Sequence, residues 1–222
     1  MTLETIDVET ARDPDASVIW LHGLGADGYD FEPVVPQLVR AGERAWRFVF
    51  PHAAVRAVTI NGGARMRAWY DIIGFDRRAK EDEAGFKGTD ADVRELIDRE
   101  VARGIPASRI VLGGFSQGGA VSLYTGLRHP ERLAGVMALS TYLPLSARLA
   151  AERAPANAGT AVFMAHGLGD AVLPLAMGLE SRDFLQALGW PVEWHQYAMA
   201  HSVCAEELAD IRQFLFRALP QA

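Results

Sequence analysis

Ser116 stands in a pattern of glycines that could turn its hydroxyl group into a nucleophile. The segment from Gly114 to Gly118 has the form G-x-S-x-G and follows an apolar run at residues 110–113. A serine on a sharp strand-to-helix turn needs strained backbone angles, so glycines beside it let the neighbouring backbone pass without Cβ clashes. Gly119 would allow close packing of the helix. The pattern can also arise by chance in glycine-rich turns, but the expected strand and helix around it favour a nucleophile.

A base and an acid that orients the base are needed, because a serine hydroxyl is a weak nucleophile near neutral pH. Asp170 and His201 follow Ser116 in the order Ser, Asp, His that is typical of this motif. Each comes after an apolar run, where a strand is expected to end. The alternatives are an ordinary turn aspartate and a structural histidine. Order and placement predict a triad of Ser116 as nucleophile, His201 as general base and Asp170 as the orienting residue.

Three other histidines also follow apolar runs, namely His22, His52 and His166. The first two precede Ser116 in the chain, and His166 lies on the same turn as Asp170. None of them fits the order of the triad as well as His201 does.

Two backbone N–H groups aimed at one point would be needed to stabilise the negative charge that forms during attack. In proteins with this motif, one N–H comes from the residue after the nucleophile, which is Gln117 here. The other comes from a loop after an early strand, and Leu24 between two glycines is the candidate. A plain glycine-rich turn is the alternative. Beside the triad, the pattern predicts an oxyanion hole formed by Leu24 and Gln117.

Alternating short and long apolar patterns predict the elements that would hold these residues. Short β-branched runs alternate with longer segments of helical period, which is typical of parallel strands joined by crossover helices. In such sheets ligands bind at the carboxyl ends of the strands. The expected strands are residues 18–21, 48–50, 110–113, 135–139, 161–165 and 192–197. The expected helices are residues 30–41, 89–103, 117–128, 175–188 and 203–219, with Thr89 and Ser202 as candidate caps.

The segment 53–88 fits neither a strand period nor a helix period. It contains two adjacent glycines, Gly62 and Gly63, and a charged stretch at residues 76–83. Long segments of this kind often carry function, so we expect a loop or a small hairpin over the active site. Trp69 and Tyr70 are candidates for lining the substrate pocket, although aromatic pairs are also common in protein cores.

The composition is typical of a soluble globular protein with one domain. The chain has 222 residues, of which 50% are hydrophobic and 23% are charged. A net charge of −6 argues against nucleic acid as a partner, because binding phosphates requires clustered Lys and Arg. The single cysteine, Cys204, permits no intramolecular disulfide, and no zinc motif occurs, so we expect a reducing compartment and no metal. An acidic N-terminus and the lack of a long apolar run predict a cytoplasmic protein without stable membrane insertion.

Several segments in a fixed order resemble the phospholipase/carboxylesterase family, which includes carboxylesterases and acyl-protein thioesterases. They are residues 22–28, 114–119, 139–144, 166–170 and 199–202. The resemblance covers nearly the whole chain and implies one α/β-hydrolase domain over residues 1–222, with a mostly parallel central sheet and helices on both faces. It implies hydrolysis of carboxylic esters or thioesters without a cofactor, by the triad and the oxyanion donors named above. Members of the family often form dimers, so a homodimer is compatible with the resemblance, but the sequence does not determine the oligomeric state.

The chain departs from the family pattern at two places. After Asp170 it has Ala171-Val172-Leu173-Pro174, which keeps the family's helix-starting proline but changes the apolar residues before it. At the position of Tyr142 the eukaryotic members of the family more often have a different residue, so their activity on acylated proteins is not carried over to this chain. We expect small to medium acyl esters or thioesters as substrates instead. Other hydrolases of this fold, such as a peptidase or a lactonase, and a non-catalytic binding protein are the alternatives. The candidate pocket residues are Trp69, Tyr70, Tyr142 and Val172.

Overall fold

A seven-stranded sheet forms the centre of the computed structural model, which describes residues 3–74 and 81–221. The strands are β1 (Thr5–Glu9), β2 (Ala16–Leu21), β3 (Trp46–Pro51), β6 (Ile110–Phe115), β7 (Gly135–Leu139), β8 (Val162–Gly167) and β9 (Val192–Tyr197). They lie in the order β1-β3-β2-β6-β7-β8-β9. Strand β1 is antiparallel to β3, and the other neighbouring pairs are parallel, so the prediction of a mostly parallel sheet is confirmed.

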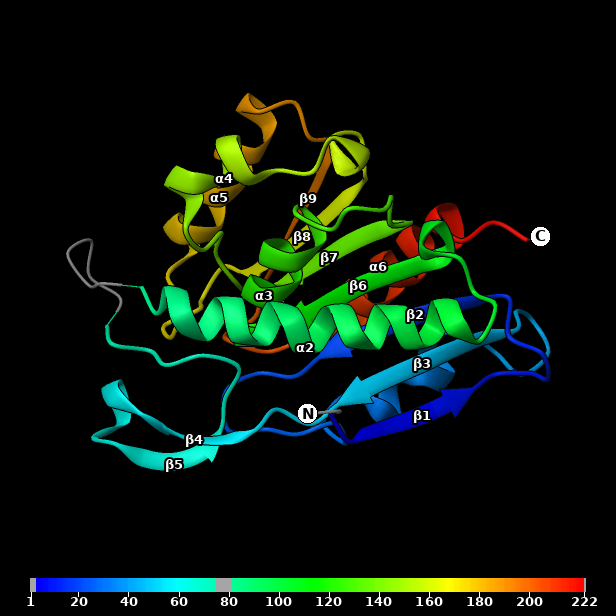
Figure 1. Cartoon of the computed structure of the whole chain (residues 1–222), viewed down its shortest axis with the longest axis horizontal. Helices are drawn as coiled ribbons and strands as arrows, with labels where there is room; N and C mark the ends of the chain where they lie inside the picture. Colours follow the sequence, from blue (N-terminus) through cyan, green and yellow to red (C-terminus); the bar gives the residue numbers. More distant parts are fainter. Residues whose placement is uncertain (1–2, 75–80, 222) are drawn as a thin grey trace.

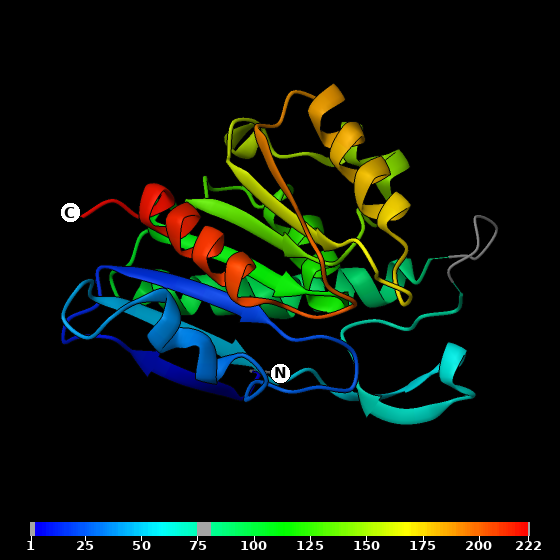
Figure 2. The same ribbon diagram turned by 180° about the vertical axis from the view of Figure 1, so that it is seen from behind.

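Helices cover both faces of the sheet (Figures 1 and 2). One face packs against α2 (Glu83–Ala102), α3 (Gln117–Gly126), α4 (Ser146–Glu152) and α5 (Leu175–Ala187), and the other against α1 (Val35–Leu38) and α6 (Ala205–Ala218). In Figure 1, α2 crosses in front of the sheet, and Figure 2 shows α6 in front of it after a half turn. No helix of the described residues is long and apolar enough to cross a membrane.

Burial on both faces explains why the sequence reveals most of the strands. Along β6, Ile110 and Leu112 join the cluster under α2 and α3, whereas Val111 joins the cluster under α6. A strand buried on both sides is apolar throughout, which makes it visible in the sequence. All six predicted strands are present. The predicted strands do not include β1, an edge strand, although its alternation of Ile6 and Val8 with polar residues is the signal of a half-buried strand.

The guanidinium group of Arg47 on β3 connects β3 to the edge strand β1 and to helix α2. It donates hydrogen bonds to Asp7 and Glu9 of β1, at 2.6 Å each, and to Glu100 of α2 at 3.3 Å. The second carboxylate oxygen of Glu100 accepts a hydrogen bond of 2.6 Å from the hydroxyl of Ser17 on β2. The side chains of Arg47 and Glu100 are both buried. Buried charges of this kind persist only when they are paired and hydrogen-bonded, as these are.

The predicted helix over residues 30–41 is wrong in its length. A short 3-10 helix, Glu32–Val34, is followed by the single turn of α1, and a proline stands in the first turn of each. Because Pro33 and Pro36 lack an N–H group, they start helical turns readily but interrupt a continuous helix.

The predicted caps of two other helices are also wrong. Helix α2 begins at Glu83 rather than at Thr89, because Asp82 caps it by accepting a hydrogen bond of 2.9 Å from the N–H of Gly85. The hydroxyl of Thr89 instead donates to the carbonyl of Trp69. Helix α6 follows Cys204 without a side-chain cap, so Ser202 lies in the loop before the helix.

A small hairpin occupies the middle of the segment 53–88. Its strands are β4 (Val55–Val58) and β5 (Ala64–Arg67), and it lies beside the end of the main sheet (Figure 1). The carboxylate of Asp71 holds the loop of the hairpin, because it accepts hydrogen bonds from the N–H of Thr59 at 2.7 Å and from its hydroxyl at 2.5 Å. Part of the charged stretch 76–83 lies outside the described residues.

Candidate active site

Ser116 occupies the turn between β6 and α3 in a strained conformation. Its φ and ψ angles are 54° and −119°, a region that residues with side chains rarely adopt. A Cβ atom on Gly114 would lie 2.4 Å from the carbonyl carbon of Gly118, and one on Gly118 would lie 2.3 Å from the carbonyl oxygen of Leu21. The turn therefore requires both glycines, as the sequence predicts. At Gly119 a Cβ would lie 2.8 Å from the side chain of Thr141, which confirms the predicted close packing.

The structure brings the side chains of Ser116, His201 and Asp170 together. The Ser116 Oγ atom lies 2.9 Å from His201 Nε2, and His201 Nδ1 lies 2.7 Å from Asp170 Oδ2. Because an aspartate accepts hydrogen bonds, the proton on His201 belongs on Nδ1, which leaves Nε2 free to accept the proton of the serine hydroxyl. The imidazole ring also packs against Phe115, with ring centroids 4.7 Å apart. The arrangement can therefore transfer a proton from Ser116 to His201.

Both carboxylate oxygens of Asp170 are held by hydrogen bonds. Oδ1 accepts hydrogen bonds from the backbone N–H groups of Val172 at 2.9 Å and Leu173 at 2.8 Å, so only Oδ2 faces His201. The side chain of Asp170 is fully buried. His166 lies beneath it, with Nε2 3.5 Å from Asp170 Oδ2 and 2.8 Å from the carbonyl oxygen of Leu173. The loop thus holds the carboxylate in one orientation.

The loops that carry Asp170 and His201 are hydrogen-bonded to each other. The backbone N–H of Leu168 donates to the carbonyl of Tyr197 at 2.8 Å, and that of Gly169 donates to the carbonyl of Met199 at 3.0 Å. A Cβ at Gly167 would lie 2.3 Å from the carbonyl oxygen of Ala200, so the close approach requires glycine there. Because β8 and β9 are parallel neighbours, both loops leave the same edge of the sheet.

Leu24 and Gln117, the expected oxyanion donors, both line the cavity that contains Ser116. Gln117 is the first residue of α3, so its N–H has no acceptor inside the helix. Its side chain holds the loop before α2, because Oε1 accepts from the N–H of Trp69 at 2.8 Å and Nε2 donates to the carbonyl of Tyr70 at 2.7 Å. Their role as oxyanion donors stays a prediction.

The cavity beside Ser116 has a volume of about 310 Å³ and is mainly apolar. Tyr70 and Tyr142 share one wall, and their hydroxyl oxygens lie 3.1 Å apart. Burial raises the pKa of Tyr142 to about 12, which keeps its hydroxyl neutral. Val172 also lines the cavity. The lining residues are Gly23, Leu24, Ala26, Asp30, Ile60, Asn61, Tyr70, Ile72, Phe115, Ser116, Gln117, Tyr142, Val172, Leu173 and His201.

Trp69 does not line this cavity, contrary to the expectation from the sequence. Its ring is buried, and the indole Nε1 donates a hydrogen bond of 2.9 Å to the carbonyl of His22. Trp69 therefore supports the loop that carries Leu24. The sequence pattern treats Trp69 and Tyr70 as a pair, but they lie in an irregular bend after β5, where tertiary contacts determine the direction of each side chain.

His22 has a supporting role in the structure. Its Nε2 atom accepts a hydrogen bond of 3.0 Å from the N–H of Ala53, and its Nδ1 atom lies 2.7 Å from the carbonyl oxygen of Gly23. Burial lowers the pKa of His22 to about 4, so the ring is neutral at physiological pH. With both nitrogens occupied, His22 links the loop after β2 to the loop after β3.

Several cavity residues cannot be recognised in the sequence. Ile60 reaches the cavity from the turn between β4 and β5, Ile72 from the segment after β5, and Asp30 from the loop after β2. An isolated aliphatic residue or a loop aspartate has no pattern that distinguishes it from its neighbours. Only the tertiary fold brings these residues beside Ser116.

Comparison with known proteins gives matches along almost the whole chain. A family model described as phospholipase/carboxylesterase matches residues 3–219. The chain is 43% identical to acyl-protein thioesterase 1 of Neurospora crassa, over 93% of this chain and 88% of that protein. It is 41% identical to acyl-protein thioesterase 1 of Mycosarcoma maydis, over 93% of this chain and 92% of that protein. The crystal structure of acyl-protein thioesterase 2 from Zea mays matches with a TM-score of 0.86 and 26% identity, covering 97% of this chain and 99% of that one.

Proposed function

Because this chain belongs to the phospholipase/carboxylesterase family of α/β hydrolases, it hydrolyses esters or thioesters, and we propose that it does so through an acyl-enzyme on Ser116. The observation that carries the proposal is the chain of hydrogen bonds from Ser116 Oγ to His201 Nε2 at 2.9 Å and from His201 Nδ1 to Asp170 Oδ2 at 2.7 Å. This is the geometry that nucleophilic catalysis by serine requires.

In the first half of the proposed reaction, Ser116 Oγ attacks the carbonyl carbon of the ester while its proton passes to His201 Nε2. The carbonyl oxygen becomes an oxyanion, which the backbone N–H groups of Leu24 and Gln117 stabilise. The imidazolium that forms is stabilised by the negative charge of Asp170. The bond to the alcohol or thiol then breaks, and the leaving group takes the proton from His201 Nε2.

In the second half, a water molecule cleaves the acyl-enzyme. His201 Nε2 takes a proton from the water as its oxygen attacks the acyl carbon, and the second tetrahedral intermediate again places its oxyanion between the two N–H groups. The bond between the acyl carbon and Ser116 Oγ breaks, and the proton returns from His201 to Ser116. The reaction consumes one water, releases an acid and an alcohol or thiol, and requires no cofactor.

The size of the cavity supports small to medium acyl groups as substrates. A volume of about 310 Å³ is at the lower end of the range for small-molecule sites. The wall formed by Tyr70 and Tyr142 is bulky and hydrogen-bonded, which limits the length of an acyl chain beside Ser116. The two fungal relatives are named for thioester hydrolysis on acylated proteins, so thioesters belong in the substrate range that we propose.

A series of p-nitrophenyl esters of increasing acyl length, with an acyl-CoA beside them, tests this proposal. We expect kcat/KM to be highest for short to medium chains and to decrease for long chains that exceed the cavity. Replacing the wall residue by Tyr142→Ala should move the preferred length upward. If no ester or thioester is hydrolysed, or if kcat/KM increases steadily to the longest chain, the proposal is wrong.

A further inference from the structure

Asp30 is the one residue of the cavity lining, among the described residues, that carries a fixed charge. The other lining residues are glycines, aliphatic and aromatic residues, amides, Ser116 and His201. In apolar pockets a small number of polar groups usually determine which ligand binds. A single carboxylate in such a lining is therefore a candidate for selecting substrates.

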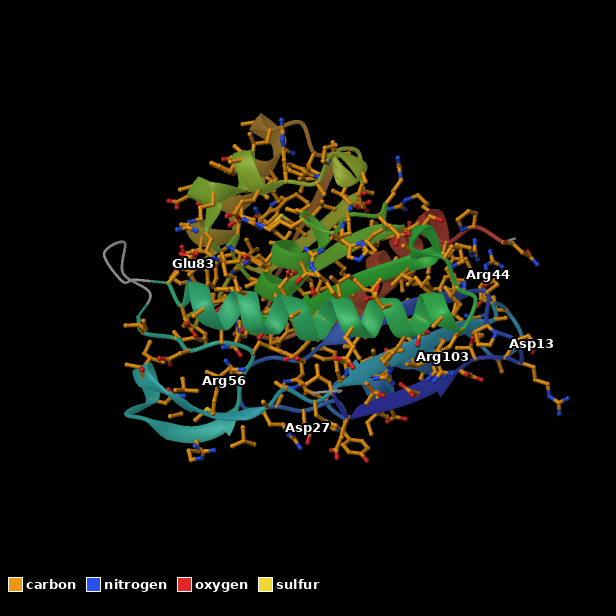
Figure 3. The ribbon with its side chains drawn as sticks, in the orientation of Figure 1. Asp13, Asp27, Arg44, Arg56, Glu83 and Arg103 are labelled. Carbon is orange, nitrogen blue, oxygen red and sulfur yellow. The ribbon has the colours of Figure 1, made fainter. Side chains whose placement is uncertain are left out.

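The carboxylate of Asp30 has no partner within the described parts of the chain. Its backbone N–H donates to the carbonyl of Asp27 at 3.2 Å, but its side chain forms no hydrogen bond or ion pair with another described residue. Asp27, labelled in Figure 3 on the loop after β2, is itself an acid, and its carboxylate accepts a hydrogen bond of 2.9 Å from the N–H of Tyr29. Partial burial and the charge of Asp27 raise the pKa of Asp30, in keeping with a carboxylate that no cation of the described residues pairs with.

An exposed aspartate without a partner is common on protein surfaces, where water solvates it and its charge has little effect. The position of Asp30 differs, because it shares a cavity with Ser116 and His201 whose other walls are largely apolar. Apolar walls concentrate the field of a charge within a cleft and strengthen its interaction with a charged ligand. The carboxylate of Asp30 therefore makes a negative contribution to the electrostatic potential in the cavity.

We propose that Asp30 makes the active site select esters and thioesters that carry a positive charge and discriminate against anionic ones such as acyl-CoA. The inference rests on the hydrolase function proposed above. A quaternary ammonium or a protonated amine of a substrate bound in this cavity would share the cavity with the carboxylate of Asp30. An interaction of this kind at about 4 Å in water-like surroundings changes kcat/KM by about fivefold.

Two pairs of thioesters that differ in charge but not in shape test the inference at pH 8. The first pair is acetylthiocholine and its neutral isostere 3,3-dimethylbutyl thioacetate, which place the charge on the leaving group. The second is the ethyl thioester of 4-trimethylammoniobutyrate and that of 5,5-dimethylhexanoate, which place it on the acyl group. For each variant the ratio of kcat/KM for the charged ester to that for the neutral ester is measured, so general losses of activity cancel.

We expect Asp30→Asn to lower this ratio about fivefold in at least one pair, and Asp30→Glu to retain it. Asp30→Asn should also increase the ratio of kcat/KM for acetyl-CoA to that for 3,3-dimethylbutyl thioacetate. The control is Asp98→Asn, which alters net charge equally on an exposed part of α2 outside the cavity and should leave the ratios unchanged. In 1 M salt, where the Debye length is about 3 Å, the effect of Asp30→Asn should shrink.

Ratios in Asp30→Asn that stay within twofold of the wild type in both pairs would overturn the inference. A change of equal size in Asp98→Asn would do so too, because it would show an effect of net charge. Hydrolysis of the neutral thioesters by the wild-type protein separates the two claims. Its absence contradicts the proposed function, whereas its presence with unchanged ratios contradicts only the selection by Asp30.

Discussion

Asp170 illustrates how a common residue acquires a particular role. Its Oδ1 atom accepts two backbone hydrogen bonds, which leaves Oδ2 aimed at His201 at 2.7 Å. The sequence shows only an aspartate in a glycine-containing turn, where such hydrogen bonds to the backbone are ordinary. Here the turn and the proposed catalytic role use the same side chain, one oxygen for each. The two interpretations of the sequence are therefore compatible.

Replacing Asp170 by Asn should abolish most of the activity. An amide at this position would donate where a carboxylate accepts, so His201 would present the wrong nitrogen to Ser116 and its positive charge would lose a partner. We expect kcat for a short p-nitrophenyl ester to decrease by about ten-thousandfold, with the fold retained by circular dichroism. A decrease of less than tenfold would show that Asp170 does not orient the base.

Asp183→Asn is the matched control for this substitution. The side chain of Asp183 is 63% exposed on α5 and forms a surface ion pair with its neighbour Arg182, so kcat should stay close to that of the wild type. A carboxylate inside a surface helix usually faces solvent, so Asp210 on α6 would be a second candidate for a control. In the structure Asp210 instead accepts a hydrogen bond of 2.8 Å from the hydroxyl of Tyr197, which makes it a poorer control.

The sequence locates residues that belong to a local pattern and misses those that do not. Ser116 is recognisable because the glycines around it are needed in its own turn. Tyr70 lines the cavity as predicted, whereas Trp69 is turned away from it, because the direction of a side chain in an irregular segment depends on tertiary contacts. Asp30 has no local signal of any kind. Residue types therefore predict the proposed chemistry better than they predict the walls of the pocket.

At the scale of elements, the parallel strands bring the site together, and the sequence predicts these strands but not their order in the sheet. The strands β6 and β8 end at the segments that carry Ser116 and Asp170, and β7 lies between them. The alternating apolar runs predict these strands, because burial on both faces makes them apolar. Helix starts are less visible, since Asp82 caps α2 from within a charged stretch that has no apolar period.

Arg47→Met should destabilise the protein strongly by breaking the contact between β1, β3 and α2. The substitution keeps most of the apolar stem but leaves the buried carboxylate of Glu100 without its arginine partner in β3. Breaking a buried ion pair on one side typically costs about 3–5 kcal/mol. Urea denaturation should show a loss of this size.

The comparison variant is Lys87→Met, which removes an ion pair with Glu83 on the surface of α2. Surface pairs contribute little because water screens them, so the urea midpoint should stay nearly unchanged. If Arg47→Met and Lys87→Met shift the midpoint equally, the network around Arg47 has no special role in attaching β1.

For the whole molecule, the buried carboxyl of Glu207 on α6 links stability to pH. Burial raises its pKa to about 8 from the ordinary value of 4.5. Between these values the folded protein keeps a proton that the unfolded chain has released, so stability decreases as pH rises through this window. His22 has a lowered pKa of about 4, and its effect is confined to pH values below about 6.5.

Glu207→Gln should therefore flatten the decrease in stability between pH 6.5 and 8. The wild-type protein is expected to lose about 1.4 kcal/mol per pH unit from this group, whereas a neutral glutamine cannot titrate. Urea denaturation of both proteins at several pH values measures the difference. Parallel curves for the two proteins would show that Glu207 already carries its charge in the folded state.

Covalent labelling with a fluorophosphonate tests the central claim most directly, because the probe reacts with an activated serine nucleophile. We predict one adduct per chain, located on Ser116 by mass spectrometry of the digested protein. Ser116→Ala should fold normally, remain unlabelled and lose more than a thousandfold in ester hydrolysis. An adduct on a different residue, or near wild-type turnover in Ser116→Ala, would contradict the assignment of Ser116 as the nucleophile.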